Sequence, residues 1–423
     1  MSYALQTGVI AVLLALSAPV AIHASEDIPG ASIEGLLSLA QERNPEYASM
    51  RFEAQAAAER VAPAGALMDP KFRIEWMDIT KMGEQKPTLW PSEVGSTQYT
   101  LMQDIPWFGK RGLKRDIAQF EAQGSEGKAM GVWSELAARI KTVQAQRYYL
   151  RGNEKLTQEI LDLMARLEQV AQSRYAGGLA AQQDVIRSQV EQTNMRNELV
   201  MIESERLQAD ARLNALLARP AQAPLAPATS LRMMPAAALL DTAKLEQRVR
   251  SRSPQLFSEE ARIQSAQKSR DLAFKNRYPD FTLSISPTQV ESRVKEWSLM
   301  LEVNIPLQQS SRRAMEREAE AMLSAARSRK EAAANQVLAE LAQNLAGMEA
   351  ARRTAALATG SLLPQADLSF SSALASYENG KLDFSALLDA QRQIRQAKQS
   401  QLKAQLEEQM RLAEIEKLLG EDL

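Results

Sequence analysis

Two aspartates, Asp184 and Asp389, are placed where a carboxylate could act on ions. Each follows a glycine-containing turn and lies among the first residues of a predicted long helix. A carboxylate near a helix N-terminus is stabilised by the helix dipole. The same carboxylate attracts cations when several copies line a narrow mouth. The residues alone leave both interpretations open, so the elements that carry the two aspartates must be worked out first.

The chain has few of the residue types that catalytic and metal sites commonly use. Cysteine is absent, and the one histidine is His23. Disulfides, thiolate zinc sites and thiol nucleophiles are therefore excluded. The sequence carries no Walker loop, no dinucleotide fingerprint and no cluster of metal ligands. The net charge is −1, so no basic excess points to nucleic acid. We predict no enzyme activity, no cofactor and no metal site.

Residues 1–24 are predicted to be a secretory signal peptide. Gly8 to Ala18 is an apolar stretch of the length of a signal h-region and is too short to span a bilayer. Small residues up to Ala24 offer a cleavage site. Residues 1–7 contain no Lys or Arg, unlike an ordinary signal peptide. A buried N-terminal helix is therefore the alternative.

The rest of the chain consists of two copies of one unit. The stretch LMQDIP at 101–106 returns as LEVNIP at 301–306, and RYAGGLAAQQDVIRSQ at 174–189 returns as SYENGKLDFSALLDAQ at 376–391. Pro45 and Pro70 return as Pro254 and Pro279. Four matches in the same order indicate an internal duplication. We predict a first repeat at 25–218, a proline-rich connector at 219–235 and a second repeat at 236–423.

Each repeat is predicted to contain a helix, two strands, a very long helix, a tight turn and a long return helix. The first helices are placed at about 33–60 and 242–274, the very long helices at about 113–174 and 312–377, and the return helices at about 182–218 and 384–419. A helix of about 62 residues is ~93 Å long at ~1.5 Å per residue. That length far exceeds what a globular core needs.

The predicted strands alternate between apolar and polar residues, as in Phe72, Ile74 and Trp76, or Trp297, Leu299, Leu301, Val303 and Ile305. This pattern fits a sheet between lipid and a wet lumen, or a half-buried sheet of a soluble protein. Four strands cannot close a barrel with a channel, and an open sheet edge is not viable in lipid. Very long helices that continue directly from the strands favour a barrel completed by several chains.

Over nearly the whole mature chain, the sequence resembles the TolC-type outer-membrane efflux proteins. The resemblance is carried by the duplicated order, by the junctions IPWFGKRGLKR and IPLQQSSRRA, and by the turns RYAGGLAAQQDV and SYENGKLDFSALLDAQ. It implies a mainly α-helical homotrimer with a twelve-stranded β-barrel in the outer membrane of a Gram-negative bacterium. A long α-helical barrel then extends through the periplasm to an adaptor protein and an inner-membrane RND-type pump.

The resemblance also implies a function, a passive exit duct of a tripartite efflux system. The junction IPWFGKRG is most similar to channels of heavy-metal cation efflux. A type I secretion or multidrug exit duct remains an alternative cargo class. An alternative from a different functional class is a periplasmic coiled-coil adaptor or structural protein. This alternative accounts for the helices but not for the paired alternating strands.

The resemblance assigns residues to three parts of such a channel. Asp184 and Asp389 fall at the periplasmic entrance, although Ala386 and Leu382 stand where relatives often carry an acidic and a basic residue. The helix turns that meet the adaptor contain Tyr175, Gly177, Gly178, Tyr377, Gly380 and Lys381. The junction between barrel and helices contains Pro106, Trp107, Gly109 and Pro306.

Overall fold

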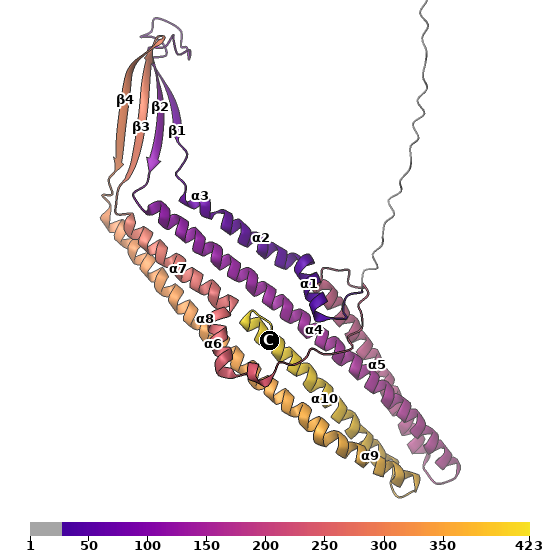
Figure 1. Ribbon diagram of the computed structural model, residues 1–423. Helices are drawn as coiled ribbons and strands as arrows, with labels where there is room; N and C mark the ends of the chain where they lie inside the picture. The colour runs from indigo at the N-terminus through magenta and orange to yellow at the C-terminus, as the bar shows by residue number, and fades with distance from the viewer. Residues whose placement is uncertain (1–27) are drawn as a thin grey trace, which may run out of the picture.

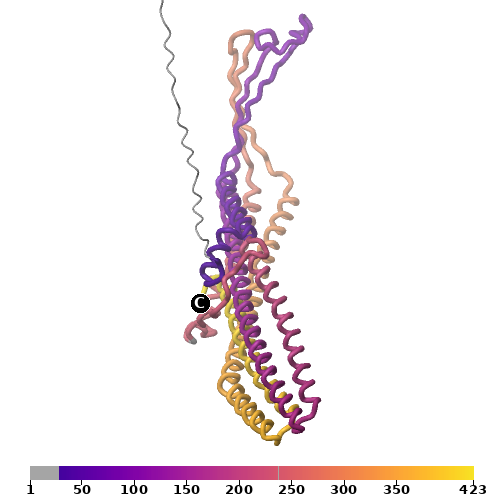
Figure 2. The backbone as a smooth tube through the Cα atoms, turned by 90° about the vertical axis from the view of Figure 1, so that its right-hand side faces the viewer, coloured from indigo at the N-terminus to yellow at the C-terminus, as the bar shows by residue number. Residues whose placement is uncertain are grey.

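The computed structural model describes residues 28–423, so the predicted signal peptide lies outside the described residues. The chain is elongated, with a four-stranded sheet at one end and two tight helical turns at the other (Figure 1). Long helices connect these two ends. A view turned by 90° shows that the molecule is narrow in this direction (Figure 2).

The first helix of each repeat is not continuous, so this part of the prediction is wrong. The structure divides residues 33–65 into α1 (Ile33–Arg43), α2 (Pro45–Glu59) and α3 (Val61–Gly65), and residues 242–275 into α6 (Thr242–Arg252) and α7 (Pro254–Lys275). Helices break before Pro45 and Pro254 because proline disfavours the helical conformation of the residue before it. The side-chain oxygen of Asn44 then accepts a hydrogen bond from the Tyr47 N–H at 3.0 Å and caps α2.

The four strands form one antiparallel sheet in chain order. They are β1 (Lys71–Met77), β2 (Ser96–Ile105), β3 (Asp280–Val290) and β4 (Arg293–Asn304). Leu101 pairs with Phe72 on β1 and with Ile285 on β3, and Ile285 pairs with Leu299 on β4. Because side chains alternate along a strand, this register collects apolar residues on one face and polar residues on the other.

The long helices run from the sheet to the turns. In the first repeat α4 (Lys110–Ala176) has 67 residues, and α5 (Gln182–Leu216) packs against it on the way back. In the second repeat the single helix predicted over 312–377 is wrong. The helix α8 (Gln309–Leu357) passes through a π-helical turn at Ala358–Leu362 into α9 (Leu363–Glu378), and α10 (Phe384–Leu419) returns. The wider turn ends two residues before Pro364, whose ring cannot be accommodated in a regular α-helical interior.

The helices follow the order of the strands to which they are joined. Helix α2 packs against α4, α4 against α7, and α7 against α8. The strands lie in the order β1, β2, β3, β4. In the described part of the chain, the sheet and the row of helices therefore each have two open edges. The edges β1 and α2 lie on one side, and the edges β4 and α8 lie on the other.

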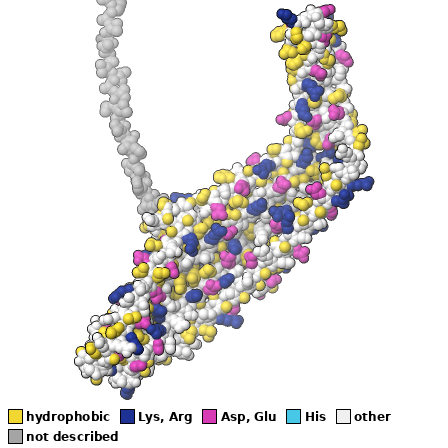
Figure 3. All heavy atoms as spheres, turned by 180° about the vertical axis from the view of Figure 1, so that it is seen from behind, with side chains coloured by type: hydrophobic (Ala, Val, Ile, Leu, Met, Phe, Trp, Pro, Cys, Tyr) yellow, Lys and Arg dark blue, Asp and Glu magenta, His cyan; other side chains and the backbone are white. Residues whose placement is uncertain are grey.

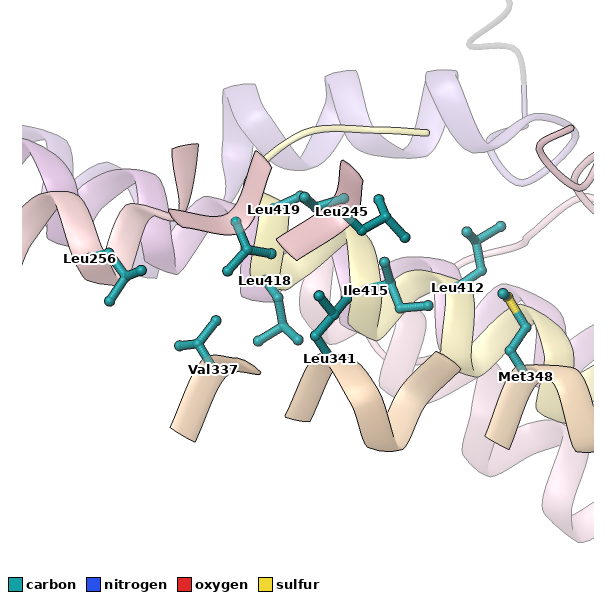
Figure 4. Close-up of a cluster of buried hydrophobic side chains, with 10 residues drawn as sticks. Leu245, Leu256, Val337, Leu341, Met348, Leu412, Ile415, Leu418 and Leu419 are labelled. Carbon is teal, nitrogen blue, oxygen red and sulfur yellow. The ribbon is translucent and has the colours of Figure 1, made fainter. Parts of the chain in front are cut away.

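Buried apolar side chains form separate clusters along the helices. One cluster joins α6, α7, α8 and α10 through residues such as Leu245, Leu341 and Ile415 (Figure 4). A second includes Leu36 and Leu213, and a third lies near the turns around Tyr377. A narrow array of long helices has no common centre, so each stretch is stabilised by its own cluster.

Across residues 28–423, no helix is both long enough and apolar enough to cross a membrane.

Residues 219–235 form neither helix nor strand but are held by polar contacts. Arg147 on α4 donates to the Ala226 carbonyl at 2.9 Å. Arg232 donates to Glu416 on α10 at 2.7 Å, and the same buried carboxylate accepts from Lys141 on α4 at 2.8 Å. A buried charge is tolerated when it is paired in this way.

Candidate functional site

The first strand-to-helix junction is fixed by the indole and the backbone of Trp107. The preceding Pro106 has no N–H, so the β ladder ends there. The Trp107 N–H donates to the Asp280 carboxylate at 2.7 Å. Its ring stacks on Tyr278 at 5.0 Å and on Phe281 at 5.7 Å between centroids. Trp107 therefore joins the start of α4 to the start of β3.

A buried cation completes this junction. Lys110 is only 5% exposed, and its ammonium group donates to the Asp280 carboxylate at 2.8 Å and to the Tyr278 carbonyl at 3.0 Å. Gly109 before it has a φ of 84°, and a Cβ there would lie 2.6 Å from the ammonium nitrogen of Lys275. The positive φ is the reason for glycine here, because a residue with a Cβ is strained in this conformation, whereas the end of the lysine side chain can move aside.

The second junction, at Pro306, is more open. Leu307 stands in the sequence position that corresponds to Trp107 and is 82% exposed. The Gln309 side chain donates to the Pro306 carbonyl at 2.7 Å. Contacts to the end of α7 are polar: Arg277 pairs with Glu316, and Arg312 donates to the Asn276 carbonyl.

The two faces of the sheet differ as the alternation predicts. On the apolar face Phe72, Leu299 and Leu301 remain exposed by 64%, 75% and 64%. On the other face Asp104 accepts hydrogen bonds from Lys71 at 2.8 Å and Thr282 at 2.7 Å. Along the helical body, by contrast, side chains of both charges are interspersed (Figure 3).

Two glycine turns reverse the long helices at the far end. Gly177 ends α4, while Gly178 and Gly380 each have a φ of 71°, which suits glycine after a helix C-terminus. Tyr175 and Lys381 are exposed in these turns.

Tyr377 differs from the other residues assigned to the turns. It is 2% exposed and packs on Phe384 with 5.4 Å between ring centroids. Because the Tyr377 side chain is buried within the chain, it stabilises the second turn by packing inside it.

Asp184 and Asp389 have different surroundings. Asp184 is half-buried in the first turn of α5. Burial raises the pKa of this carboxyl, Asp383 raises it further, and Arg187 and Arg174 oppose the change. Asp389 is exposed, and Arg392 on the same helix lies 3.3 Å from its carboxylate. The structure thus couples Asp184 to Asp383, which caps α10 by accepting from the Ala386 N–H at 3.0 Å.

Sequence reasoning missed two residues that the structure makes prominent. Asp280 holds Trp107 and Lys110, and Arg174 contacts both turns. One signal in the sequence pointed to Asp280. The corresponding residue of the first repeat, which follows Pro70, is Lys71, so the charge at this position differs between the repeats. Arg174 gave no signal beyond being a cation near a helix end.

The fold defines a class of protein. VceC, an outer membrane protein from Vibrio cholerae, matches with a TM-score of 0.77 and 16% identity, over 92% of this chain and 96% of VceC. CusC, which forms a transmembrane channel, matches with a TM-score of 0.77 and 16% identity over 92% of each chain. The fold is therefore that of the TolC-type outer-membrane channels.

The sequence comparison then identifies the family. The sequence profile of the family "Outer membrane efflux protein" matches residues 36–219 and 245–421. The chain belongs to this family, and the resemblance seen in the sequence is confirmed. It is also 24% identical over 374 residues to the cobalt-zinc-cadmium resistance protein CzcC of Cupriavidus metallidurans, across 87% of this chain and 84% of CzcC. The protein is an outer-membrane efflux channel with a periplasmic helical portion.

Proposed function

We propose that three copies of the chain form a passive exit duct. This proposal rests on the open edges of the sheet and of the helices, which lie on the same sides of the chain: β1 with α2 on one side and β4 with α8 on the other. A head-to-tail contact between neighbouring copies pairs both layers at once, and such contacts close into a ring. Each copy contributes its two repeats, residues 25–218 and 236–423, joined by the connector 219–235. Three copies give twelve strands and no sheet edge in lipid.

The duplication supports a register for the contact between copies. Leu301 follows Leu101 by 200 residues, and Ile285 follows Trp76 by 209. Leu101 pairs with Ile285 inside the chain. Repetition of this pairing places Leu301 of one copy opposite Trp76 of the next. Both residues belong to the apolar face, so the pairing preserves the two-faced character of the sheet.

Cysteine pairs test this arrangement, because the natural chain contains none. Leu301→Cys combined with Trp76→Cys is expected to give disulfide-linked dimers and trimers in detergent. Leu301→Cys with Arg73→Cys is the matched control, since Arg73 lies on the opposite face. Light scattering on the unmodified protein is expected to give the mass of a trimer. A monomer, or equal cross-linking of the control, contradicts the proposed ring.

The two ends of the proposed duct meet different surroundings. Outer-membrane lipid surrounds the sheet, and the junction residues Pro106, Trp107, Gly109 and Pro306 mark its periplasmic boundary. A periplasmic adaptor protein contacts the turns through Tyr175, Gly177, Gly178, Gly380 and Lys381, and links the duct to an inner-membrane RND-type pump. Asp184 and Asp389 line the entrance. The exposed turn residues and the left-handed glycines support this assignment.

We propose heavy-metal cations as the cargo. The support is the likeness to CzcC, a protein of cobalt-zinc-cadmium resistance. Deletion of the gene in its host is expected to lower tolerance to Co²⁺, Zn²⁺ or Cd²⁺, and the unmodified gene to restore it. An assembly-defective variant serves as the control for expression. Unchanged metal tolerance with increased sensitivity to dyes and drugs would instead assign the duct to multidrug efflux.

A further inference from the structure

Arg174 contacts the backbone of both helix turns of the chain. It lies in the last turn of α4, and one terminal nitrogen donates to the Leu179 carbonyl of its own turn at 3.2 Å. The other terminal nitrogen donates to the Glu378 carbonyl of the second turn at 2.7 Å. These two acceptors are about 200 residues apart in sequence, so one side chain joins the tips of two separate hairpins.

The acceptor in the second turn is a helix-terminal carbonyl. Glu378 is the last residue of α9, and the final carbonyls of a helix have no partner within it. A cation at this end also interacts favourably with the helix dipole. Arg174 therefore supplies the hydrogen bond that the end of α9 requires.

The second turn is shaped to accept the guanidinium group. Arg174 lies over the ring of the buried Tyr377, 4.9 Å from its centroid, in the geometry of a cation–π contact. Gly380 follows in the same turn, and a Cβ at this residue would lie 3.3 Å from a terminal nitrogen of Arg174. A flat guanidinium with several donors can serve two carbonyls and an aromatic face together, whereas an ammonium group cannot.

We propose that Arg174 is a positioning residue that holds the two turns of each chain together as one unit. This inference deepens the proposed exit duct, because the turns form its periplasmic entrance. With Arg174 in place, the α4–α5 hairpin and the α9–α10 hairpin keep a fixed separation at their tips. Without it, the tips separate and the entrance widens.

The separation of the turns can be measured directly. In the cysteine-free chain, Gln183→Cys at the exposed start of α5 and Lys381→Cys in the second turn place one spin label at the tip of each hairpin. To report on a single chain, labelled protein is mixed with an excess of unlabelled protein before assembly. Pulsed dipolar spectroscopy in detergent is expected to give a longer and broader distance distribution for Arg174→Ala than for the parent. Arg174→Lys keeps the charge but is expected to shift the distribution in the same direction.

Arg166→Ala is the matched control. Arg166 is an exposed arginine of the same helix, about two turns before Arg174, and its removal is expected to leave the distribution unchanged. An unchanged distribution in Arg174→Ala, or an equal shift in Arg166→Ala, overturns the proposal.

Conductance separates this inference from the proposed function. In planar bilayers, Arg174→Ala is expected to increase the conductance of single channels relative to the parent and to Arg166→Ala. If the parent forms no channels, the exit duct is contradicted while the distance measurement still decides the role of Arg174. If the distance shifts but conductance does not, Arg174 joins the turns without controlling the entrance, and that part of the proposal is wrong.

Discussion

The two strand-to-helix junctions descend from one repeated stretch of sequence but are built differently. In the first, Trp107 stacks on Tyr278 and Lys110 is buried against Asp280. In the second, Leu307 and Ser310 occupy the corresponding positions, and both are exposed. The first junction joins two neighbouring strands of the same chain, while the second lies at the open edge formed by β4.

This difference shows how a duplicated unit diverges. A junction inside the chain can rely on partners that are always present, so aromatic stacking around Trp107 and a buried lysine can be built there. In the proposed trimer, a junction at an edge must stay compatible with a second copy that arrives later. The following predictions test whether the interior and the edge of the sheet differ in this way.

The largest effect is expected on the apolar face of the edge strand. Leu301→Arg places a cation on the face assigned to lipid, at a cost of about 2–4 kcal/mol if the residue lies near the bilayer midplane. Trimer yield after extraction from the outer membrane should fall. Ser298→Arg, on the polar face of the same strand, should assemble normally. Equal tolerance of both substitutions would show that the faces of β4 are assigned incorrectly.

A smaller effect is expected inside the first junction. Lys110→Met leaves the Asp280 carboxylate and the Tyr278 carbonyl without their donor. The Asp280 side chain is 44% exposed, so we expect a loss of about 1–3 kcal/mol rather than the larger cost of a fully buried orphan charge. The denaturant midpoint measures this loss.

The corresponding substitution at the second junction is the control for Lys110→Met. Ser310→Met alters an exposed residue and should change stability by no more than about 0.5 kcal/mol. If both substitutions destabilise the protein equally, the two junctions are equivalent and the comparison between them fails.

At the opposite end of the molecule, ionisation of Asp184 is expected to lower the stability of the folded chain. A carboxylate that stabilises a helix end would instead raise it. The pKa of Asp184 is raised in the folded chain above 3.8, its ordinary value. Between these two pKa values the folded state binds more protons than the unfolded state, so stability falls as pH rises through this window. Asp184→Asn should remove this fall and be no less stable than the parent at neutral pH. Thermal midpoints of both proteins across pH 3–7 measure the effect, and a less stable variant at pH 7 would contradict it.

The smallest energetic effect is expected for ion selectivity. In the proposed duct, threefold repetition of Asp184 and Asp389 concentrates negative potential at the entrance. The double variant Asp184→Asn with Asp389→Asn keeps the shape and removes the charges. In planar bilayers it should show weaker cation selectivity and weaker block by multivalent cations. Selectivity and block equal to the parent, together with lower thermal stability, would identify both aspartates as helix-end stabilisers.

The sequence predicted the two-faced strands and the limits of the return helices well. Alternation of residues such as Phe72 and Arg73 determines which side chains share a face, and this depends only on the geometry of a strand. The second return helix was predicted at 384–419 and is observed at Phe384–Leu419. Asp383 at its start and Gly420 at its end are local signals for capping a helix.

The sequence-based prediction was less successful where a local break interrupts a long stretch of helical periodicity. The breaks before Pro45 and Pro254 lie inside stretches of helical periodicity, and the periodicity was given too much weight against proline. The π-helical turn at Ala358–Leu362 also precedes a proline, Pro364, but there the helix widens and continues instead of ending.

By itself, the sequence determined the repeated order of elements, the faces of the strands and the glycine turns, because each depends on neighbours along the chain. Tertiary structure alone decided that Lys110 is buried against Asp280, that Tyr377 faces inward and that Arg174 reaches the second turn. The Lys110 and Arg174 contacts join residues about 170 and about 200 positions apart, respectively. No local pattern can encode such a contact, because a side chain acquires its burial and its partner only when distant helices pack side by side.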